Sequence, residues 1–215
     1  MKILALNASP RSDGNSAVLV EAAATGARDA GHEVTVLHLD AFVDGALRDC
    51  RRCRRSDGGC AIPDSYELLL MEHLLPADGL LLSTPLYWYG MSGQLKSMFD
   101  RLFCYMSPGY PRSAEVLASL PGMRVGVLIA CEESYPGATL GLRAQLQELT
   151  RYLRQDLVDV VVGVGNSRGE VARDPKDPIS AAAQLGRRLL DTRVADYCFD
   201  TPRGHSVWPQ DDVRP

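Results

Sequence analysis

Hydrophobic runs and helical patterns alternate along the chain. The runs that fit β-strands lie at residues 2–7, 33–39, 78–84, 124–131 and 157–164. Amphipathic stretches that predict helices lie at about 16–30, 63–75, 92–105, 141–154 and 179–195. Gly31 stands where the first helix should stop, and Pro63 stands where the second should begin. Because strands that alternate with helices form parallel sheets with right-handed crossovers, we predict an α/β fold with a doubly wound, five-stranded parallel sheet.

The remaining segments are expected to be irregular, at residues 40–61, 106–122, 165–177 and 197–215. The chain has 215 residues, of which 46% are hydrophobic, and this suffices for one sizeable core. We therefore predict one domain over residues 1–196, followed by a C-terminal arm over 197–215. Ligands of doubly wound sheets bind at the carboxyl ends of the strands. The loops that follow the first, third and fourth strands should therefore converge on one crevice, at residues 8–16, 85–91 and 131–138.

Charge and cysteine content limit the classes of function. The formal net charge of −4 argues against a general binder of nucleic acids or membrane surfaces. The first predicted strand begins at Lys2, so we expect no signal peptide, and no apolar run reaches the roughly 18 residues of a membrane span. Six cysteines in such a chain are more typical of thiols or ligands than of a disulfide framework. We expect a cytoplasmic protein.

The loop after the first strand has the composition of an anion site. It leads directly into a predicted helix, whose first N–H groups and dipole favour negative charge. Ser9, Asn15 and Ser16 could donate hydrogen bonds to phosphate oxygens, and Arg11 adds a charged fork. Gly14 is expected to take a positive φ. The loop is neither a dinucleotide-binding glycine loop nor a Walker A loop. The alternative is a polar loop that ends in an ordinary serine cap.

Three consecutive aromatic residues, Tyr87, Trp88 and Tyr89, follow the third strand. They could cover a flat heteroaromatic ring, with Gly90 letting the backbone approach that ring closely. Alternatively, they pack under the end of the sheet or at a subunit contact. Together with Met91 they form more apolar surface than one exposed loop should leave in water. The glycine-rich run from Gly163 to Gly169 opens no helix, so a nucleotide role there has little support.

Two motifs together resemble those of the NAD(P)H-dependent FMN reductases. They read Asn7-Ala8-Ser9-Pro10-Arg11-x-x-Gly14-Asn15-Ser16 and Thr84-Pro85-Leu86-Tyr87-Trp88-Tyr89-Gly90-Met91-Ser92-Gly93-Gln94-Leu95-Lys96-x-x-x-Asp100-Arg101. The resemblance covers about residues 1–195. It places the chain in the flavodoxin-like fold, on the branch that includes the iron–sulfur flavoproteins, and implies the strand order 2-1-3-4-5.

The resemblance also implies where a cofactor binds. The FMN phosphate would lie in loop 9–16, held by Ser9, Arg11, Asn15 and Ser16. The isoalloxazine ring would lie against loop 85–90, lined by Pro85, Leu86, Tyr87, Trp88, Tyr89 and Gly90. Similar proteins are usually homodimers with the flavin near the subunit interface, so we expect a homodimer. The competing arrangement is a lid within one chain, formed by residues 106–122 or by the C-terminal arm.

The cysteine segment departs from the iron–sulfur pattern. Cys50, Cys53 and Cys60 have the spacing of a compact cluster motif, but Ser56 occupies the third position. A four-iron cluster normally requires four thiolates. Vestigial or structural thiols are the favoured interpretation, with a zinc site, a disulfide or a cluster as alternatives. The four histidines have no ligand spacing, and we predict no metal site.

The predicted function is an FMN-dependent oxidoreductase. It takes hydride from NADH or NADPH and reduces a small-molecule acceptor: a quinone, a flavin, a nitro or azo compound, or a pathway intermediate. Because the flavin does the redox chemistry, no catalytic side chain is assigned. The alternatives are an iron–sulfur electron carrier and a flavin-binding protein without enzymatic activity. No nucleic-acid or membrane partner is expected.

Overall fold

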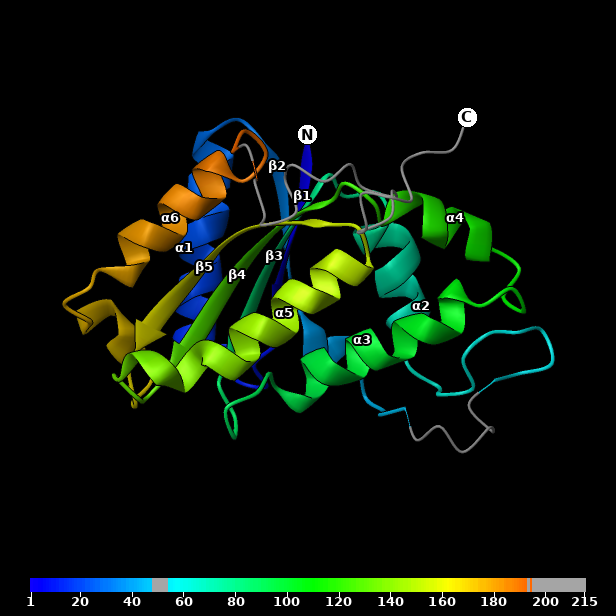
Figure 1. The fold of residues 1–215 in the computed structure, drawn as a ribbon, viewed down its shortest axis with the longest axis horizontal. Coiled ribbons are helices and arrows are strands. Elements are labelled where there is room, and N and C mark those ends of the chain that lie inside the picture. Colours follow the sequence, from blue (N-terminus) through cyan, green and yellow to red (C-terminus); the bar gives the residue numbers. More distant parts are fainter. Residues whose placement is uncertain (48–53, 193, 195–215) are drawn as a thin grey trace, which may run out of the picture.

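A computed structural model describes residues 1–47, 54–192 and 194. Its centre is one parallel sheet in the order β2-β1-β3-β4-β5 (Figure 1), as predicted. The strands are β1 (Lys2–Asn7), β2 (Glu33–His38), β3 (Gly79–Pro85), β4 (Arg124–Cys131) and β5 (Asp156–Val164). This order and the flavodoxin-like fold are those that the two motifs imply. Cys50, Cys53 and the arm predicted over 197–215 lie outside the described residues.

Helices cover both faces of the sheet. The helices α1 (Asn15–Asp29) and α6 (Pro178–Arg188) pack on one face, and α3 (Gly93–Met106) and α5 (Leu140–Tyr152) pack on the other (Figure 1). Side chains of β1 alternate between the two cores: Leu4 and Leu6 face α3, while Ile3 and Ala5 face α1. Burial on both faces explains why the sequence of β1 is continuously hydrophobic.

Helices α1 and α6 approach each other closely through two glycines. A Cβ atom on Gly186 would lie 1.8 Å from the Ala23 carbonyl oxygen, and one on Gly26 would lie 1.9 Å from the Ala183 carbonyl oxygen. Real Cβ atoms do not come this near to a backbone atom, so both positions need glycine. The close packing brings the segment between β5 and α6 beside the start of α1.

The structure corrects several predicted elements. The helix predicted from Pro63 begins at Tyr66 as α2 (Tyr66–Leu68) and continues as a π-helical segment, Leu69–Leu74. Asp64 explains the late start, since its carboxylate accepts the Tyr66 N–H at 3.2 Å and is held by Arg101. The last helix ends at Arg188 instead of near residue 195.

The loop predicted over 106–122 contains a short helix, α4 (Ser113–Ser119). Two features favour it: Val116 is completely buried, and Arg112 donates two hydrogen bonds to Glu115 one turn away, both at 2.8 Å. Short 3₁₀ turns at Leu39–Ala41, Pro136–Thr139 and Glu170–Arg173 also lie within segments predicted as irregular or as loop. Within the described part of the chain, no helix is both long enough and apolar enough to cross a bilayer.

Candidate functional site

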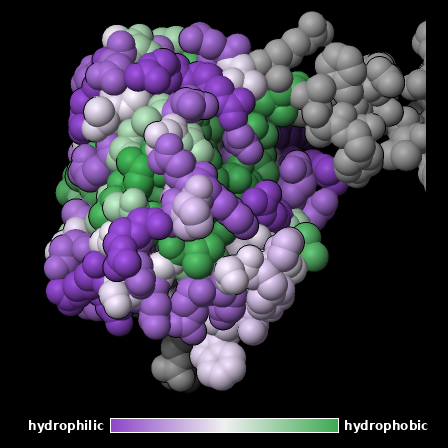
Figure 2. Space-filling view, turned by 90° about the vertical axis from the view of Figure 1, so that its left-hand side faces the viewer, coloured by the Kyte–Doolittle hydropathy of each residue, from purple (hydrophilic) through white to green (hydrophobic). Residues whose placement is uncertain are grey.

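A cavity of about 660 Å³ opens at the carboxyl ends of the strands. Residues after β1, β3 and β4 line it, so the three loops expected to converge do meet there, and the loop after β5 joins them. Figure 2 shows the side of the molecule toward which β5 points in Figure 1. On this side, hydrophobic residues are surrounded by hydrophilic ones. A site of this size with mixed lining suits a cofactor or a drug-sized ligand.

The structure brings nine of the ten predicted site residues to this cavity, namely Ser9, Arg11, Asn15, Ser16, Pro85, Leu86, Tyr87, Trp88 and Tyr89. Gly90 is not among the lining residues. Glu132 and Glu133 belong to the loop 131–138 that was expected there, whereas Gly165, Asn166 and Arg168 come from a stretch for which the sequence supported no role. The glycine-rich segment after β5 therefore belongs to the cavity wall, although its composition gave little reason to expect this.

The loop after β1 is shaped by its own polar side chains. Asn7 accepts the Ser9 N–H at 3.0 Å through its side-chain oxygen, and the Ser9 hydroxyl accepts the Arg11 N–H at 3.1 Å. Gly14, the N-cap of α1, has a φ of −83°, so the positive φ expected there is wrong. Because Gly14 has no side chain to accept hydrogen bonds, the first N–H groups of α1 are left for a ligand.

The cation and hydroxyls of this loop suit a phosphate group. The Arg11 side chain is exposed, and no ion-pair partner for it occurs among the described residues. Ser9 and Ser16 are buried at the cavity wall, with exposed fractions of 5% and 2%. Uncapped helix N–H groups, two hydroxyls and a guanidinium together form the donor set that a phosphate monoester requires. The residues present therefore fit the phosphate end of FMN.

Asn15 has structural partners within the protein, in addition to the role toward phosphate that was expected of it. Its side-chain NH₂ donates to the Gly165 carbonyl at 2.8 Å, and its side-chain oxygen accepts the Val171 N–H at 3.2 Å. Both ends of the amide thus join the start of α1 to the segment after β5. One of its two N–H donors remains for a ligand. We interpret Asn15 mainly as a residue that positions the cavity wall.

The aromatic residues occupy a tight reverse turn. Tyr87 and Gly90 exchange two backbone hydrogen bonds of 3.0 Å, and the two residues between them, Trp88 and Tyr89, have φ values of 49° and 60°. Side-chain-bearing residues rarely adopt this region, which costs about 1–3 kcal/mol for each residue. Gly90 has no positive φ, and a Cβ atom there would meet only the Tyr87 carbonyl at 3.7 Å. The close approach of the backbone to a bound ring, expected at Gly90, stays a prediction.

The turn presents its rings at the rim of the cavity. Trp88 is 97% exposed, and Tyr87 and Tyr89 are 43% and 52% exposed. Met91, expected in the same exposed surface, instead lies in the main core with an exposed fraction of 8%. An aromatic wall over a cavity can cover a planar ring system. The position of the turn thus agrees with the ring end of a flavin.

Two buried hydroxyls, which sequence reasoning left without a role, hold the loops together. Thr84 accepts the Ser92 N–H at 3.0 Å, and the Ser92 hydroxyl donates to the Ala8 carbonyl at 2.7 Å. The latter bond ties the loop after β1 to the start of α3. Both residues stand within the second of the two quoted motifs, so that motif is the signal from which their role could have been found. Their burial makes these bonds part of the preorganised site.

Cys131 contributes a neutral thiol to the cavity wall. It ends β4, is 4% exposed, and its Sγ donates to the Glu133 carbonyl at 3.4 Å. Burial, assisted by the neighbouring charge of Glu133, raises its pKa. A thiol with a raised pKa is a poor nucleophile at neutral pH, which argues against covalent catalysis by Cys131.

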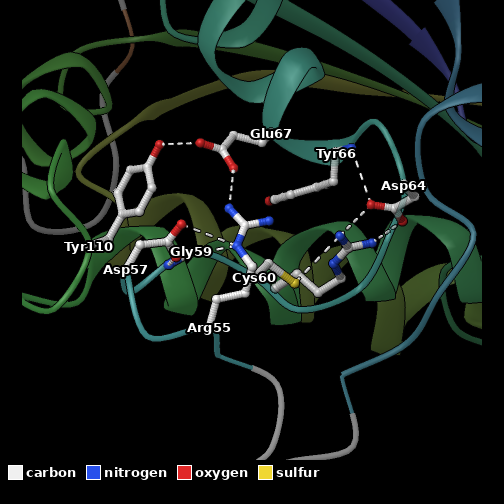
Figure 3. Close-up of polar contacts among 9 residues, drawn as sticks. Arg55, Asp57, Gly59, Cys60, Asp64, Tyr66, Glu67 and Tyr110 are labelled. Atoms are coloured by element: carbon white, nitrogen blue, oxygen red, sulfur yellow. Dashed lines mark hydrogen bonds and ion pairs between the residues drawn. The ribbon is translucent and has the colours of Figure 1, made fainter.

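The described part of the cysteine segment is held by ion pairs and hydrogen bonds (Figure 3). The Cys60 Sγ accepts a hydrogen bond of 3.6 Å from Arg101, whose guanidinium also binds the Asp64 carboxylate. Ser56 is exposed to solvent. Among the residues that the structure describes, no three His, Cys, Asp or Glu side chains converge as metal ligands. Because Cys50 and Cys53 lie outside the described residues, the expectation that this segment holds no cluster stays a prediction.

Comparison with known proteins agrees with this geometry. The model of the NADPH-dependent FMN reductase family matches residues 1–172. The YwqN protein of Bacillus subtilis is 30% identical over 190 residues, which cover 87% of this chain and 98% of YwqN. Its name describes it, provisionally, as an NAD(P)H-dependent FMN-containing oxidoreductase. The iron–sulfur flavoprotein MJ1083 of Methanocaldococcus jannaschii is 34% identical over 103 residues, about half of each chain.

A solved structure extends the similarity to the fold. An NAD(P)H:quinone oxidoreductase from Methanothermobacter marburgensis superimposes with a TM-score of 0.63 at 19% identity, covering 91% of this chain and 98% of that one. The family match spans most of the chain, including both loops that carry the predicted site. The chain therefore belongs to the NADPH-dependent FMN reductase family.

Proposed function

We propose that this protein binds FMN in the cavity and works as an NAD(P)H-dependent oxidoreductase for a small-molecule acceptor. The observation that carries the proposal is the uncapped start of α1, which meets Ser9, Arg11 and Ser16 in one cavity. These groups would bind the phosphate, and the turn Tyr87–Gly90 would cover the ring.

The protein's own contribution is binding and orientation. A bound flavin supplies the redox chemistry, accepting hydride from NAD(P)H and delivering two electrons to the acceptor. Arg11 and the helix N–H groups would fix the phosphate end, which sets the depth of the ring in the cavity. The aromatic turn would exclude water from one side of that ring. No side chain is required to transfer a proton during the hydride step.

The acceptor is proposed only as a class: a quinone, a flavin, a nitro or azo compound, or a pathway intermediate. Proteins of similar fold are named for reduction of quinones and azo compounds, which supports a small planar acceptor. The rim in this chain consists largely of exposed aromatic side chains, which suits such a molecule.

An anaerobic titration tests the proposed function. The purified protein, reconstituted with FMN, is mixed with NADH or NADPH while its visible flavin absorbance is followed. We expect prompt bleaching, and denaturation should release FMN with little FAD. Absence of bleaching would instead favour a flavin carrier. A broad brown absorbance that persists, together with stoichiometric bound iron and sulfide, would favour the iron–sulfur alternative.

We also propose that the working unit is a homodimer with the aromatic turn at its interface. Leu140, at the start of α5, is 66% exposed, and a Cβ atom on the next residue, Gly141, would lie 3.8 Å from the carbonyl oxygen of Tyr89 on the turn. The turn and the start of α5 thus form one exposed apolar surface. Burying each such side chain contributes about 1.5–3 kcal/mol. In a two-fold interface, each side chain is buried once from each subunit, so its contribution counts twice.

A charge at Leu140 tests the dimer. Leu140→Asp is expected to shift the protein toward monomer in light scattering at micromolar concentration, and turnover with NAD(P)H should fall with the dimer. Leu117→Asp, at a similarly exposed position on α4, serves as the control and should change neither quantity. A wild-type protein that is monomeric and fully active at that concentration would contradict the proposal and favour a lid within one chain.

A further inference from the structure

The segment between β5 and the 3₁₀ turn Glu170–Arg173 places a second arginine, Arg168, at the phosphate end of the cavity. Arg168 lines the cavity, and its guanidinium contacts the Asp13 carboxylate at 2.8 Å. Asp13 belongs to the same loop as Arg11 and immediately precedes Gly14. The Arg168 guanidinium therefore lies beside the loop that would bind phosphate, although 155 residues separate the two along the chain.

The backbone that carries Arg168 is held in place on both sides. The Glu170 carboxylate accepts the N–H groups of Asn166 and Ser167 at 2.9 and 2.8 Å. The side-chain amide of Asn15 binds Gly165 and Val171, which flank the segment. A Cβ atom on Gly165 would lie 2.6 Å from the Val171 nitrogen, so this close contact requires glycine. A charged side chain on such a rigid support is already positioned for a ligand.

The contact between Arg168 and Asp13 is weak enough to exchange. The two side chains are 64% and 61% exposed, and exposed ion pairs of this kind contribute little to stability. A phosphate monoester carries more negative charge than a carboxylate and accepts bidentate hydrogen bonds from arginine. A phosphate entering the cavity would therefore compete well with Asp13 for the guanidinium.

We propose that Arg168 binds a phosphate group of the nucleotide held in the cavity, with Asp13 as the partner that it exchanges for that phosphate. This inference rests on the proposed function, because the nucleotide is either FMN or the nicotinamide dinucleotide. Both carry phosphate, and the chemistry that Arg168 recognises is the same in each case. An experiment can distinguish whether this phosphate belongs to FMN or to the nicotinamide dinucleotide.

Flavin binding to the apoprotein gives the first test, through the quenching of flavin fluorescence. Arg168→Gln is expected to weaken FMN binding about tenfold and to leave riboflavin binding unchanged, since riboflavin lacks the phosphate. Asp13→Asn should tighten FMN binding, and this gain should shrink when Arg168 is also replaced. Arg187→Ala is the matched control, because Arg187 forms a similarly exposed ion pair with Asp29 at 3.1 Å, away from the cavity.

The remaining outcomes assign the phosphate or overturn the inference. Unchanged FMN binding with a roughly tenfold rise in the KM for NADPH or NADH would assign Arg168 to the phosphates of the hydride donor. Equal losses for FMN and riboflavin would show a structural role and overturn it, as would no change in any of these quantities. If the wild-type protein binds no flavin at all, the proposed function fails and this inference fails with it.

Discussion

Asp64→Asn is expected to lower the free energy of unfolding by about 3–5 kcal/mol, because it leaves a buried arginine without its counterion. Arg101 has an exposed fraction of 0%, and its guanidinium makes a bidentate contact with the Asp64 carboxylate. The guanidinium also lies 4.5 Å from the centre of the Tyr66 ring, and the Asp64 side chain is only 6% exposed, so little solvent reaches the pair. Urea denaturation of the variant and the wild type measures the difference.

A matched control uses the neighbouring residue of the same helix. Asp100 forms an exposed ion pair with Lys96, so Asp100→Asn should cost less than about 1 kcal/mol. The double variant Asp64→Leu/Arg101→Met removes both charges and should recover much of the stability that the single variant loses. Equal effects of Asp64→Asn and Asp100→Asn would contradict our view that the buried pair holds the segment before α2 on α3.

The pH dependence of stability offers a check on the same pair. Burial alone would raise the Asp64 pKa, but hydrogen bonds from Arg101 and from the N–H groups of Asp44 and Tyr66 outweigh it and hold that pKa below its usual value. Such a carboxyl stabilises the fold above its unfolded-state pKa and loses this contribution as the pH falls through its folded-state pKa. The stability difference between wild type and Asp64→Asn should therefore shrink below about pH 4.

Arg11→Ala is expected to weaken FMN binding by about 1.5–3 kcal/mol, the contribution of a charge-assisted hydrogen bond. Unlike Arg168, Arg11 has no carboxylate partner among the described residues that it would first have to release, so its whole interaction with phosphate would add to affinity. Titration of the apoprotein with FMN and with riboflavin measures the effect, which should be confined to FMN. Arg28→Ala, in the last turn of α1, should leave both affinities unchanged. A similar loss of affinity for riboflavin would assign Arg11 a structural role.

The sheet could be predicted from the sequence because its signal is local. β1 and β4 have the bounds expected from their hydrophobic runs, Lys2–Asn7 and Arg124–Cys131. Burial on both faces makes such runs continuous and hence easy to delimit. Gly31 also ends α1 as expected, with a φ of 85° and its N–H on the Arg28 carbonyl.

The errors arose where distant residues determine a local conformation. The residues that position Asn15, Gly165 and Val171, lie about 150 residues away in the chain, and no local pattern indicates them. The start of α2 depends on Asp64, whose position depends on Arg101 in α3. Local propensity contains no information about such contacts, and the same reason explains why Arg168 could not be assigned to the site.

The positive φ values show this most clearly. A positive φ was expected at Gly14, yet the left-handed residues in the loops after β1 and β3 are Trp88 and Tyr89. A propensity argument assigns such a conformation to glycine or asparagine. It fails where tertiary structure imposes strain, which tends to occur at functional sites.

At the turn from Tyr87 to Gly90, the residues that stability favours differ from those that the chain has. Stability alone would favour asparagine and glycine at its two central positions, because those residues adopt left-handed backbone conformations with little strain. Tryptophan and tyrosine make the free protein less stable, and in the single chain the rings of both are largely exposed. Their presence at these positions is therefore better explained by contacts absent from the isolated chain, so selection for thermal stability and selection for activity should favour different residues at this turn.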